Sequence, residues 1–172
     1  MNKSKHSIGR LSALLLVSSS FAANAAQVQF KAYDSRGVDT GTCIEKPAVS
    51  GVYVLKACNS QNPNQKFEFD VNGYGSTISQ NYGQDCLVVT VGSSTQIGFG
   101  TGVISPRACN TNDPRVIDSE QWRWTDGTKI KVVGDDSLCL SANGLDYFPP
   151  RLVLGHCDFP TTLPQWDVMI VN

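Results

Sequence analysis

The chain has 172 residues and a formal net charge of −1, from 14 Lys and Arg against 15 Asp and Glu. Three of the cations fall within the first ten residues, whereas every carboxylate lies beyond residue 25, so residues 26–172 carry 11 − 15 = −4. This composition leaves no basic patch to hold a phosphate backbone, and we expect no nucleic-acid partner. The 147 residues beyond position 25 (172 − 25) suit a single domain with its own core.

The N-terminal segment predicts export. An apolar run from Leu11 to Ala23 follows the three cations, which is the pattern of a secretory signal peptide. Ala23-Asn24-Ala25 places small residues at −3 and −1 of a cleavage site, so we expect residues 1–25 to be removed and the mature chain to begin at Ala26. The run is shorter than the ~20 residues that span a bilayer. We therefore expect a secreted or periplasmic protein without a transmembrane segment after signal cleavage.

Beyond the signal, β-strands are predicted throughout. Short segments in which apolar and polar residues alternate are separated by Gly, Asn, Asp and Ser, and helix signals are nearly absent. Four strands recur in each of three segments, about 26–73, 74–126 and 127–172, which predicts one all-β domain. The strands are expected at 28–32, 42–44, 52–57, 67–71, 76–79, 86–91, 103–107, 122–124, 130–133, 138–141, 152–154 and 166–170. Such a sheet can close on itself and so remove its exposed edges.

Six cysteines mark the same three segments. In each segment, a Cys followed by an apolar residue is separated by a loop from a strand that ends at a second Cys, and an aromatic strand follows. Exported cysteines are expected to pair, and the most economical of the possible connectivities closes each segment on itself. The predicted pairs are Cys43 with Cys58, Cys86 with Cys109, and Cys139 with Cys157. Because no C-x-x-C occurs and His156 is the one histidine after the signal, we expect no metal site and no cofactor.

The repeat resembles that of the ricin-B type β-trefoil lectins. The shared pattern is Cys-Leu-x, an apolar strand, a second Cys and then Gln-x-aromatic, three times over the whole mature chain. The family's Gln-x-Trp signature reads Gln65-Lys66-Phe67, Glu120-Gln121-Trp122 and Pro164-Gln165-Trp166 here, so only the first repeat keeps the Gln. The resemblance implies a β-trefoil of three four-stranded repeats with pseudo-threefold symmetry and one disulfide in each repeat. Phe67, Trp122 and Trp166 would then point inward together.

The resemblance also implies a place for a sugar site. In these lectins an Asp two residues after the first Cys accepts from sugar hydroxyls, an aromatic two residues before the second Cys stacks on the ring, and an Asn-Gln pair assists. Only the first repeat keeps the polar residues. It supplies Glu45, Lys56, Asn64 and Gln65, whereas the second supplies Val88, Arg107, Ser119 and Glu120, and the third supplies Ser141, Gly155, Leu163 and Pro164.

The stacking aromatic is missing from all three repeats. A sugar site needs a flat apolar face beside its polar groups, so aromatics elsewhere would have to replace it. The candidates are Tyr53 near the first pocket and Tyr147 in the third loop, with Phe99 and Phe148 as further loop aromatics. Each of these rings could equally pack against its own loop.

Two of the predicted polar residues also have structural interpretations. Gln65 beside a core aromatic could serve to satisfy buried backbone groups. Glu45 could pair with Lys46 or Lys56 in a surface contact.

The sequence favours binding over catalysis. His156 immediately precedes a cysteine and has no Gly-x-Ser-x-Gly companion, and Asp135-Asp136 fall in a turn, where aspartates usually cap backbone groups. We expect a non-catalytic, secreted carbohydrate-binding module that recognises surface glycans. The alternative is a binding subunit of a secreted bacterial toxin, in which decayed sugar sites leave a surface for partner protein subunits. A β-trefoil protease inhibitor is a third hypothesis, which the cysteine spacing disfavours.

Overall fold

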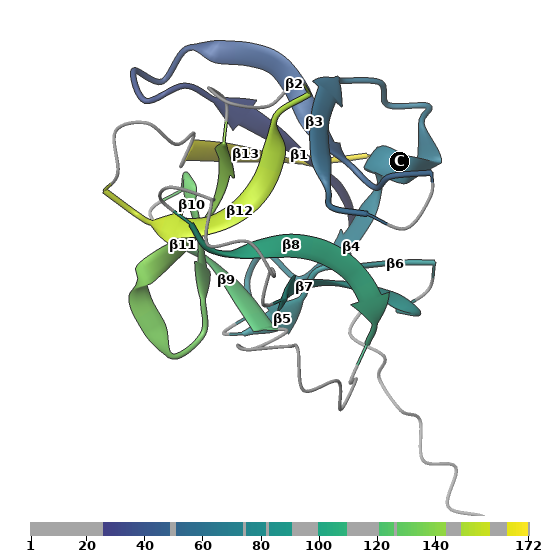
Figure 1. Cartoon of the computed structure of the whole chain (residues 1–172). Helices are drawn as coiled ribbons and strands as arrows, with labels where there is room; N and C mark the ends of the chain where they lie inside the picture. Colours follow the sequence, from purple (N-terminus) through teal and green to yellow (C-terminus); the bar gives the residue numbers. More distant parts are fainter. Residues whose placement is uncertain are drawn as a thin grey trace, which may run out of the picture.

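The computed structural model describes residues 26–48, 51–73, 75–81, 83–90, 100–109, 121–125, 127–143, 149–158 and 165–171. The predicted signal peptide lies outside these ranges. Within them the chain is all β apart from one 3-10 turn, and no helix has the length and apolar character of a membrane span. Figure 1 shows the strands curling around a common interior.

Thirteen strands make up the sheet. Their bounds are β1 (Ala26–Tyr33), β2 (Asp39–Glu45), β3 (Val54–Ala57), β4 (Phe67–Phe69), β5 (Ser76–Thr77), β6 (Ser79–Gln80), β7 (Asp85–Thr90), β8 (Gly100–Ala108), β9 (Gln121–Thr125), β10 (Lys129–Val132), β11 (Asp135–Asn143), β12 (Arg151–His156) and β13 (Gln165–Ile170), with the 3-10 helix η1 (Pro63–Gln65) between β3 and β4. Each predicted strand overlaps one of these. The strand predicted at 76–79 is divided at the buried Ile78, because β5 pairs with β9 whereas β6 pairs with β4 and β7.

The sheet curls far enough for distant strands to meet. The described pairs are antiparallel and run in the order β3-β2-β1-β4-β6-β7-β8-β12-β11-β10-β9-β5, with β13 beside β1. β12 also pairs with β3, through Arg151 and Val54. Backbone bonds on both sides of Tyr53 tie the same region together, from Tyr53 N to Ile104 O at 3.0 Å and from Leu152 N to Tyr53 O at 2.9 Å. This curling pairs strand edges that would otherwise be exposed.

The three predicted disulfides are confirmed. Cys43 bonds Cys58, Cys86 bonds Cys109, and Cys139 bonds Cys157, with Cα–Cα separations of 4.9, 4.9 and 5.0 Å. Each bridge closes a stretch of 15, 23 or 18 residues within its own repeat. Loops of this length contribute about 3 kcal/mol each if the bridge acts by restricting the unfolded chain. Disulfides of this kind persist in oxidising compartments, such as the periplasm or the cell exterior.

The recurring aromatics share one core, as predicted. Phe67, Trp122 and Trp166 are buried in the same apolar cluster. Each indole donates to the carbonyl of the Leu that follows its repeat's first Cys, from Trp122 Nε1 to Leu87 O at 2.9 Å and from Trp166 Nε1 to Leu140 O at 2.8 Å. A buried indole N–H needs such a partner. The first repeat has Phe67 at this place, which has no N–H to satisfy.

The core of the first repeat is instead filled by aromatic rings. Phe67 meets Phe30 edge-on at a centroid separation of 5.5 Å, and Phe69 lies 5.6 Å from Phe30. The Tyr53 ring lies 6.0 Å from Phe67. Aromatic pairs at these distances stabilise a fold by about 0.5–1.5 kcal/mol beyond their burial.

Candidate functional site

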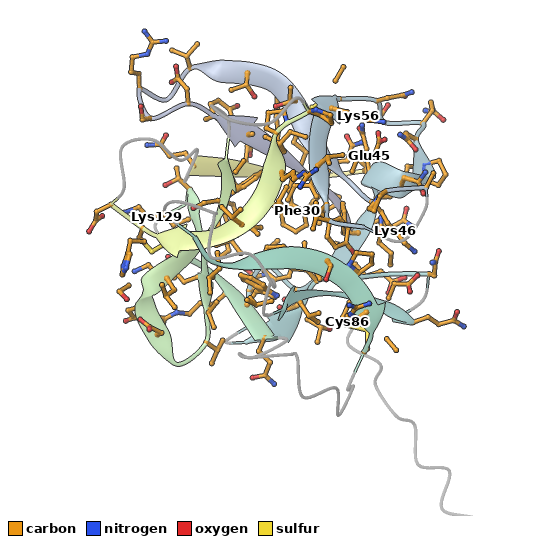
Figure 2. All side chains as sticks on the ribbon, in the orientation of Figure 1. Phe30, Glu45, Lys46, Lys56, Cys86 and Lys129 are labelled. Atoms are coloured by element: carbon orange, nitrogen blue, oxygen red, sulfur yellow. A yellow bond between two sulfur atoms is a disulfide. The ribbon has the colours of Figure 1, made fainter. Side chains whose placement is uncertain are left out.

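Four polar side chains of the first repeat meet beside the end of β2, and together they form what we call the Glu45 cluster: Glu45, Lys56, Asn62 and Gln65. Glu45 ends β2, and its strand partner across the ladder is Val54. Lys56 lies two residues further along β3, so it is a diagonal neighbour of Glu45 on the same face. Figure 2 shows Glu45 and Lys56 close together beside β3.

The loop after β3 brings two amides to this carboxylate. Asn62 caps η1, because its side-chain oxygen accepts from Asn64 N at 3.0 Å, and Pro63 occupies the first helical position. Asn59 shapes the preceding turn by accepting from Gln61 N at 2.9 Å. The capped turn leaves the Asn62 amide nitrogen free to donate to Glu45 Oε2 at 2.8 Å.

Gln65 connects the cluster to the backbone. Its amide nitrogen donates to Glu45 Oε2 at 2.9 Å and to Ala57 O at 2.9 Å, while its oxygen accepts from Asn59 N at 2.8 Å. Gln29 donates to that same oxygen at 3.4 Å. The side chain is only 1% exposed. Gln65 therefore satisfies buried groups and positions the carboxylate, and it is not available for direct contact with a ligand.

Glu45 is the group in the cluster that can meet a ligand. Its Oε2 already accepts two hydrogen bonds, whereas Oε1 forms an ion pair with Lys56 Nζ at 2.9 Å. A carboxylate oxygen can accept two bonds, so Oε1 keeps a lone pair for a further donor. The side chains of Glu45 and Lys56 are 12% and 54% exposed. Of the two cations considered as partners for Glu45, it is Lys56 that pairs with it, since Lys46 pairs with Asp85.

The predicted role of Asn64 belongs to Asn62 instead. Asn64 is exposed, and its carbonyl accepts from Lys46 N at 2.9 Å and from Gln80 Nε2 at 3.1 Å. The amide that reaches Glu45 is that of Asn62, two residues earlier. The sequence did hold a signal for this, because Asn followed by Pro is typical of a capped helix start.

Tyr53 is not a stacking platform. Its ring is fully buried, and burial raises the pKa of the Tyr53 hydroxyl well above its ordinary value. Within the described part of the chain, this hydroxyl has no hydrogen-bond partner. Backbone bonds on both sides hold the residue between β8 and β12 with its side chain toward Phe67. The prediction of Tyr53 as a ligand contact is therefore wrong.

The other candidate aromatics, Tyr147, Phe99 and Phe148, lie outside the described residues. So do four positions carried over from the lectin pattern in the second and third repeats, namely Ser119, Glu120, Leu163 and Pro164. Of the remaining positions, Val88 and Ser141 are fully buried, whereas Arg107 is half-buried. Among the described positions that correspond to the lectin pattern, only Glu45 of the first repeat is a carboxylate, and side-chain amides hold it.

Two of the three residues considered for catalysis, both aspartates, form contacts that hold neighbouring strands and backbone groups in place. Asp135 accepts from the Ser137 backbone N at 2.9 Å and from the Ser137 hydroxyl at 2.6 Å, and these bonds hold the pKa of the Asp135 carboxyl below its ordinary value. Asp136 forms an ion pair with Arg123. His156 is exposed at the end of β12. The turn itself is at residues 133–134, and both aspartates begin β11 instead of lying in the turn as predicted. Asp135 caps Ser137, as aspartates near turns commonly do, and Asp136 links β11 to β9.

Comparison with known proteins gives a likeness of fold. No family model and no curated protein matches the sequence. Among solved structures, the chain is similar to part of GalNAc-T7, crystallised with UDP, GalNAc and Mn2+, with 18% identity and a TM-score of 0.55 over 85% of this chain and 23% of that one. It is also similar to part of a mosquitocidal holotoxin, with 16% identity and a TM-score of 0.60 over 86% of this chain and 17% of that one.

A third similar structure is the GlcNAcα1-4Gal releasing endo-β-galactosidase from Clostridium perfringens. The identity is 13% and the TM-score 0.55, over 86% of this chain and 33% of that one. The chain therefore spans between 17% and 33% of the length of these three proteins. Each of them contains a region with the same all-β fold, joined to a larger remainder.

Proposed function

We propose that residues 26–172 form one β-trefoil domain of three repeats, exported behind a cleaved signal peptide, and that this domain is a non-catalytic carbohydrate-binding module for surface glycans. Its binding site is the Glu45 cluster. Three features support the proposal: the disulfide within each repeat, the aromatic core that the repeats share, and the likeness of fold to parts of larger proteins. The names of two of those proteins include the sugars GalNAc, GlcNAc or Gal.

The observation that carries the proposal is the state of the Glu45 carboxylate. Oε2 is held by Asn62 and Gln65, while among the described residues Oε1 is paired with one well-exposed lysine, Lys56. A sugar hydroxyl can donate to the remaining lone pair of Oε1, and an adjacent hydroxyl can accept from the Lys56 ammonium. An acceptor and a donor side by side match the paired hydroxyls of a sugar ring, and the fixed Oε2 keeps the carboxylate oriented before the ligand arrives.

The site is expected to bind weakly. No aromatic ring stands at position 56, so the ligand gains polar contacts without the stacking that usually accompanies them. Millimolar binding corresponds to about 4 kcal/mol. A single charge-assisted hydrogen bond contributes about 1.5–3 kcal/mol. Loss of the Glu45 charge should therefore abolish detectable binding.

A glycan array tests the proposal directly. Wild-type protein should bind a defined subset of glycans, and Glu45→Gln should lose them, because Gln keeps an oxygen for Asn62 and Gln65 but presents no second carboxylate oxygen. Glu68→Gln is the matched control, since Glu68 is also a half-buried carboxylate and accepts from Ser79 Oγ at 3.2 Å, away from the Glu45 cluster. Silence of the wild type over the whole array, or full retention by Glu45→Gln, would contradict the proposal.

A second candidate is a subunit that binds partner proteins, such as the binding subunit of a secreted bacterial toxin. It is favoured by the absence of an aromatic at the stacking position of each repeat and by the likeness to part of a holotoxin. Affinity co-purification from the native host separates the two candidates. A stable stoichiometric partner favours the subunit, and a protein that elutes as a lone monomer disfavours it.

A further inference from the structure

A hollow of about 270 Å³ lies where the first and third repeats meet, and we call it the β1–β13 pocket. It is lined by Tyr33, Gly37, Thr128, Gln165, Trp166 and Asp167, among others. β1 and β13 form its wall, with Tyr33 opposite Gln165 and Lys31 opposite Asp167 in the ladder. None of these lining residues belongs to the Glu45 cluster, so the pocket is a separate place on the protein.

Four of the polar side chains that line the pocket lack hydrogen-bond partners in the described part of the chain. Tyr33, Thr128, Gln165 and Asp167 are all half-buried, and in the described part of the chain their side chains form no hydrogen bond and no ion pair. The Asp167 carboxylate does interact electrostatically with Lys31: the pKa of Lys31 is raised chiefly by its pairing with Asp39, and Asp167 lies near enough to help raise it. Together the four side chains offer two hydroxyl groups, one amide and one carboxylate. Half-buried polar groups that lack protein partners are available to a ligand or to water.

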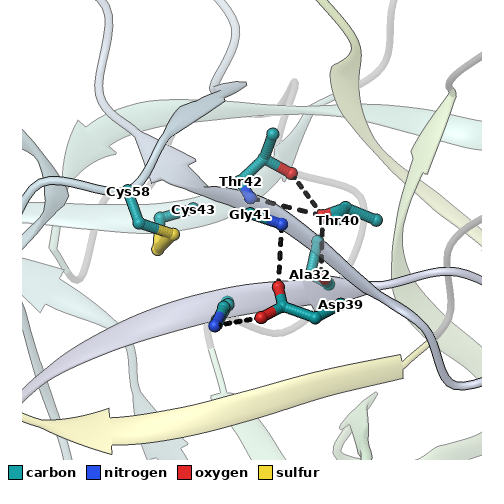
Figure 3. A network of polar contacts seen from close by, with 8 residues as sticks. Ala32, Asp39, Thr40, Gly41, Thr42, Cys43 and Cys58 are labelled. Carbon is teal, nitrogen blue, oxygen red and sulfur yellow. Dashed lines mark hydrogen bonds and ion pairs between the residues drawn. A yellow bond between two sulfur atoms is a disulfide. The ribbon is translucent and has the colours of Figure 1, made fainter.

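The opposite wall of the pocket is a well-braced hairpin. Asp34 Oδ1 accepts from the backbone N of Arg36 and of Val38, both at 2.9 Å, which folds the tip around Gly37 with its positive φ of 77°. Figure 3 shows the base of the same hairpin, where the Thr40 hydroxyl donates to Ala32 O at 2.7 Å. A Cβ at position 37 would lie 3.6 Å from Gln165 Oε1. The hairpin thus holds its backbone close to the amide of Gln165.

The corresponding hollow between the first and second repeats is different. There Glu68 faces Ser79 in the ladder, as Asp167 faces Lys31 here, and the hollow measures about 140 Å³. Two of its polar groups have protein partners: Glu68 accepts from Ser79 Oγ, and Gln80 Nε2 donates to Asn64 O at 3.1 Å and to Lys66 O at 2.9 Å. The Gln80 oxygen has no partner among the described residues. At this junction the carboxylate and one amide nitrogen are therefore bound by protein groups, whereas the carboxylate and the amide of the β1–β13 pocket form no hydrogen bond in the described part of the chain.

At the third junction, between the second and third repeats, two cations face each other in the ladder of β9 and β10. Arg123 faces Lys131 there and forms an ion pair with Asp136. Of the two hollows described, the one between the third and first repeats is the larger, and its carboxylate has no hydrogen-bond partner in the described part of the chain.

The chemistry of the lining selects the occupant. Asp167 and the Gln165 oxygen accept, while the Gln165 nitrogen and the Tyr33 and Thr128 hydroxyls donate, so a ligand rich in hydroxyls satisfies both kinds of group. None of the described lining residues is Lys or Arg and one is a carboxylate, which disfavours phosphate or carboxylate ligands. The volume is just under the ~300–1,000 Å³ of pockets for drug-sized ligands, which suits one sugar ring.

We propose that the β1–β13 pocket binds one neutral sugar residue and is a second carbohydrate site of this protein, distinct from the Glu45 cluster. The Tyr33 side chain covers the apolar side of the ring, and Asp167 with Gln165 takes its hydroxyls. Two sites on one domain let a branched or repeated glycan bind by avidity, provided that its length spans both.

Titration of the 15N-labelled exported protein with galactose, N-acetylgalactosamine and N-acetylglucosamine, followed by amide chemical shifts, tests this site. At least one sugar should shift the amides of Thr128, Gln165 and Asp167. Asp167→Asn should weaken this response at least about tenfold, as expected for the loss of a charge-assisted hydrogen bond. Glu68→Gln, the matched change in the smaller hollow, should leave it unaltered. Tyr33→Leu should weaken it too, and unchanged shifts far from the pocket verify the fold of each variant.

The Glu45→Gln variant separates this site from the proposed function. If the pocket amides still respond in that variant, the second site stands by itself. Shifts confined to the Glu45 cluster in the wild type would overturn the second site and leave the proposed function intact, whereas shifts confined to the pocket would do the reverse. A wild-type protein that responds nowhere to the three sugars, or a pocket response that Asp167→Asn does not change, would overturn the second site.

Discussion

Replacement of Gln65 by Leu should destabilise the fold substantially, because this side chain is the centre of a buried polar network. The substitution removes hydrogen bonds to Ala57 O and from Asn59 N, and it leaves Glu45 Oε2 with Asn62 as its one amide donor. Leu has a similar size, so the change tests the hydrogen bonds more than the packing.

The magnitude follows from the bonds that are lost. Two neutral hydrogen bonds contribute about 1 kcal/mol each and the one to a carboxylate about 2 kcal/mol, or about 4 kcal/mol together. Burial of an apolar side chain in place of the amide offsets about 1 kcal/mol. The free energy of unfolding should therefore fall by about 3 kcal/mol. For a domain of this size the melting temperature drops about 2–4 °C per kcal/mol, so by about 6–12 °C.

Urea unfolding followed by tryptophan fluorescence measures this change. Gln61→Leu is the matched control, because Gln61 lies in the same loop with an exposed side chain and should alter stability by less than about 0.5 kcal/mol. If Gln65→Leu lowered the free energy of unfolding by less than about 1 kcal/mol, the network would not hold the loop as the geometry indicates.

Three further substitutions test other parts of the structure. Trp166→Phe removes the indole bond to Leu140 O and leaves that buried carbonyl without its donor, so we expect a loss of about 1–3 kcal/mol by urea unfolding. Tyr53→Phe removes a buried hydroxyl without a described partner and should be neutral or stabilising by up to about 1 kcal/mol in the same assay. The hydrogen bond from Lys46, with a further one from Asn81, holds the pKa of the Asp85 carboxyl below its ordinary value. The stability that this provides is present above the ordinary pKa and is lost as the pH falls through the lower folded pKa, so Asp85→Asn should flatten unfolding free energies measured from about pH 6 to about pH 3.

For each of these three substitutions, one result would contradict the expectation. A clear loss of stability in Tyr53→Phe would mean that the hydroxyl is satisfied, for example by a buried water molecule. An unchanged acid dependence in Asp85→Asn would show that the pair with Lys46 does not contribute to folding. A neutral Trp166→Phe would indicate that the Leu140 carbonyl finds another donor.

The spacing of cysteines and aromatics predicts much of the fold because both are dictated by burial. Disulfides close short loops, and Phe67 and Trp166 must be inside, so their repetition in the sequence reflects repetition in the core. Strand limits were less predictable. The strand predicted at 76–79 is divided at Ile78 because its halves have different partners, and an exchange of strand partners leaves no mark on local periodicity.

The candidate site was predictable in part. Glu45, Lys56 and Gln65 do meet, as position within the repeat implied, whereas Asn62 replaces Asn64 because the turn that presents the amide begins with an Asn-Pro cap. Tyr53 shows what the sequence does not predict, which is the direction of a side chain. A tyrosine near a loop can face either way, and here backbone bonds on both sides direct it inward.

The pairing of β1 with β13 has a consequence for the order of the chain. Val28 lies opposite Ile170, so the first and last strands form one ribbon, and each disulfide closes within its own repeat. A circular permutant that joins these neighbouring ends by a short linker and opens the chain between two repeats would keep every cross-link. The order in which the repeats are synthesised is therefore a property of the gene, and the architecture does not require it.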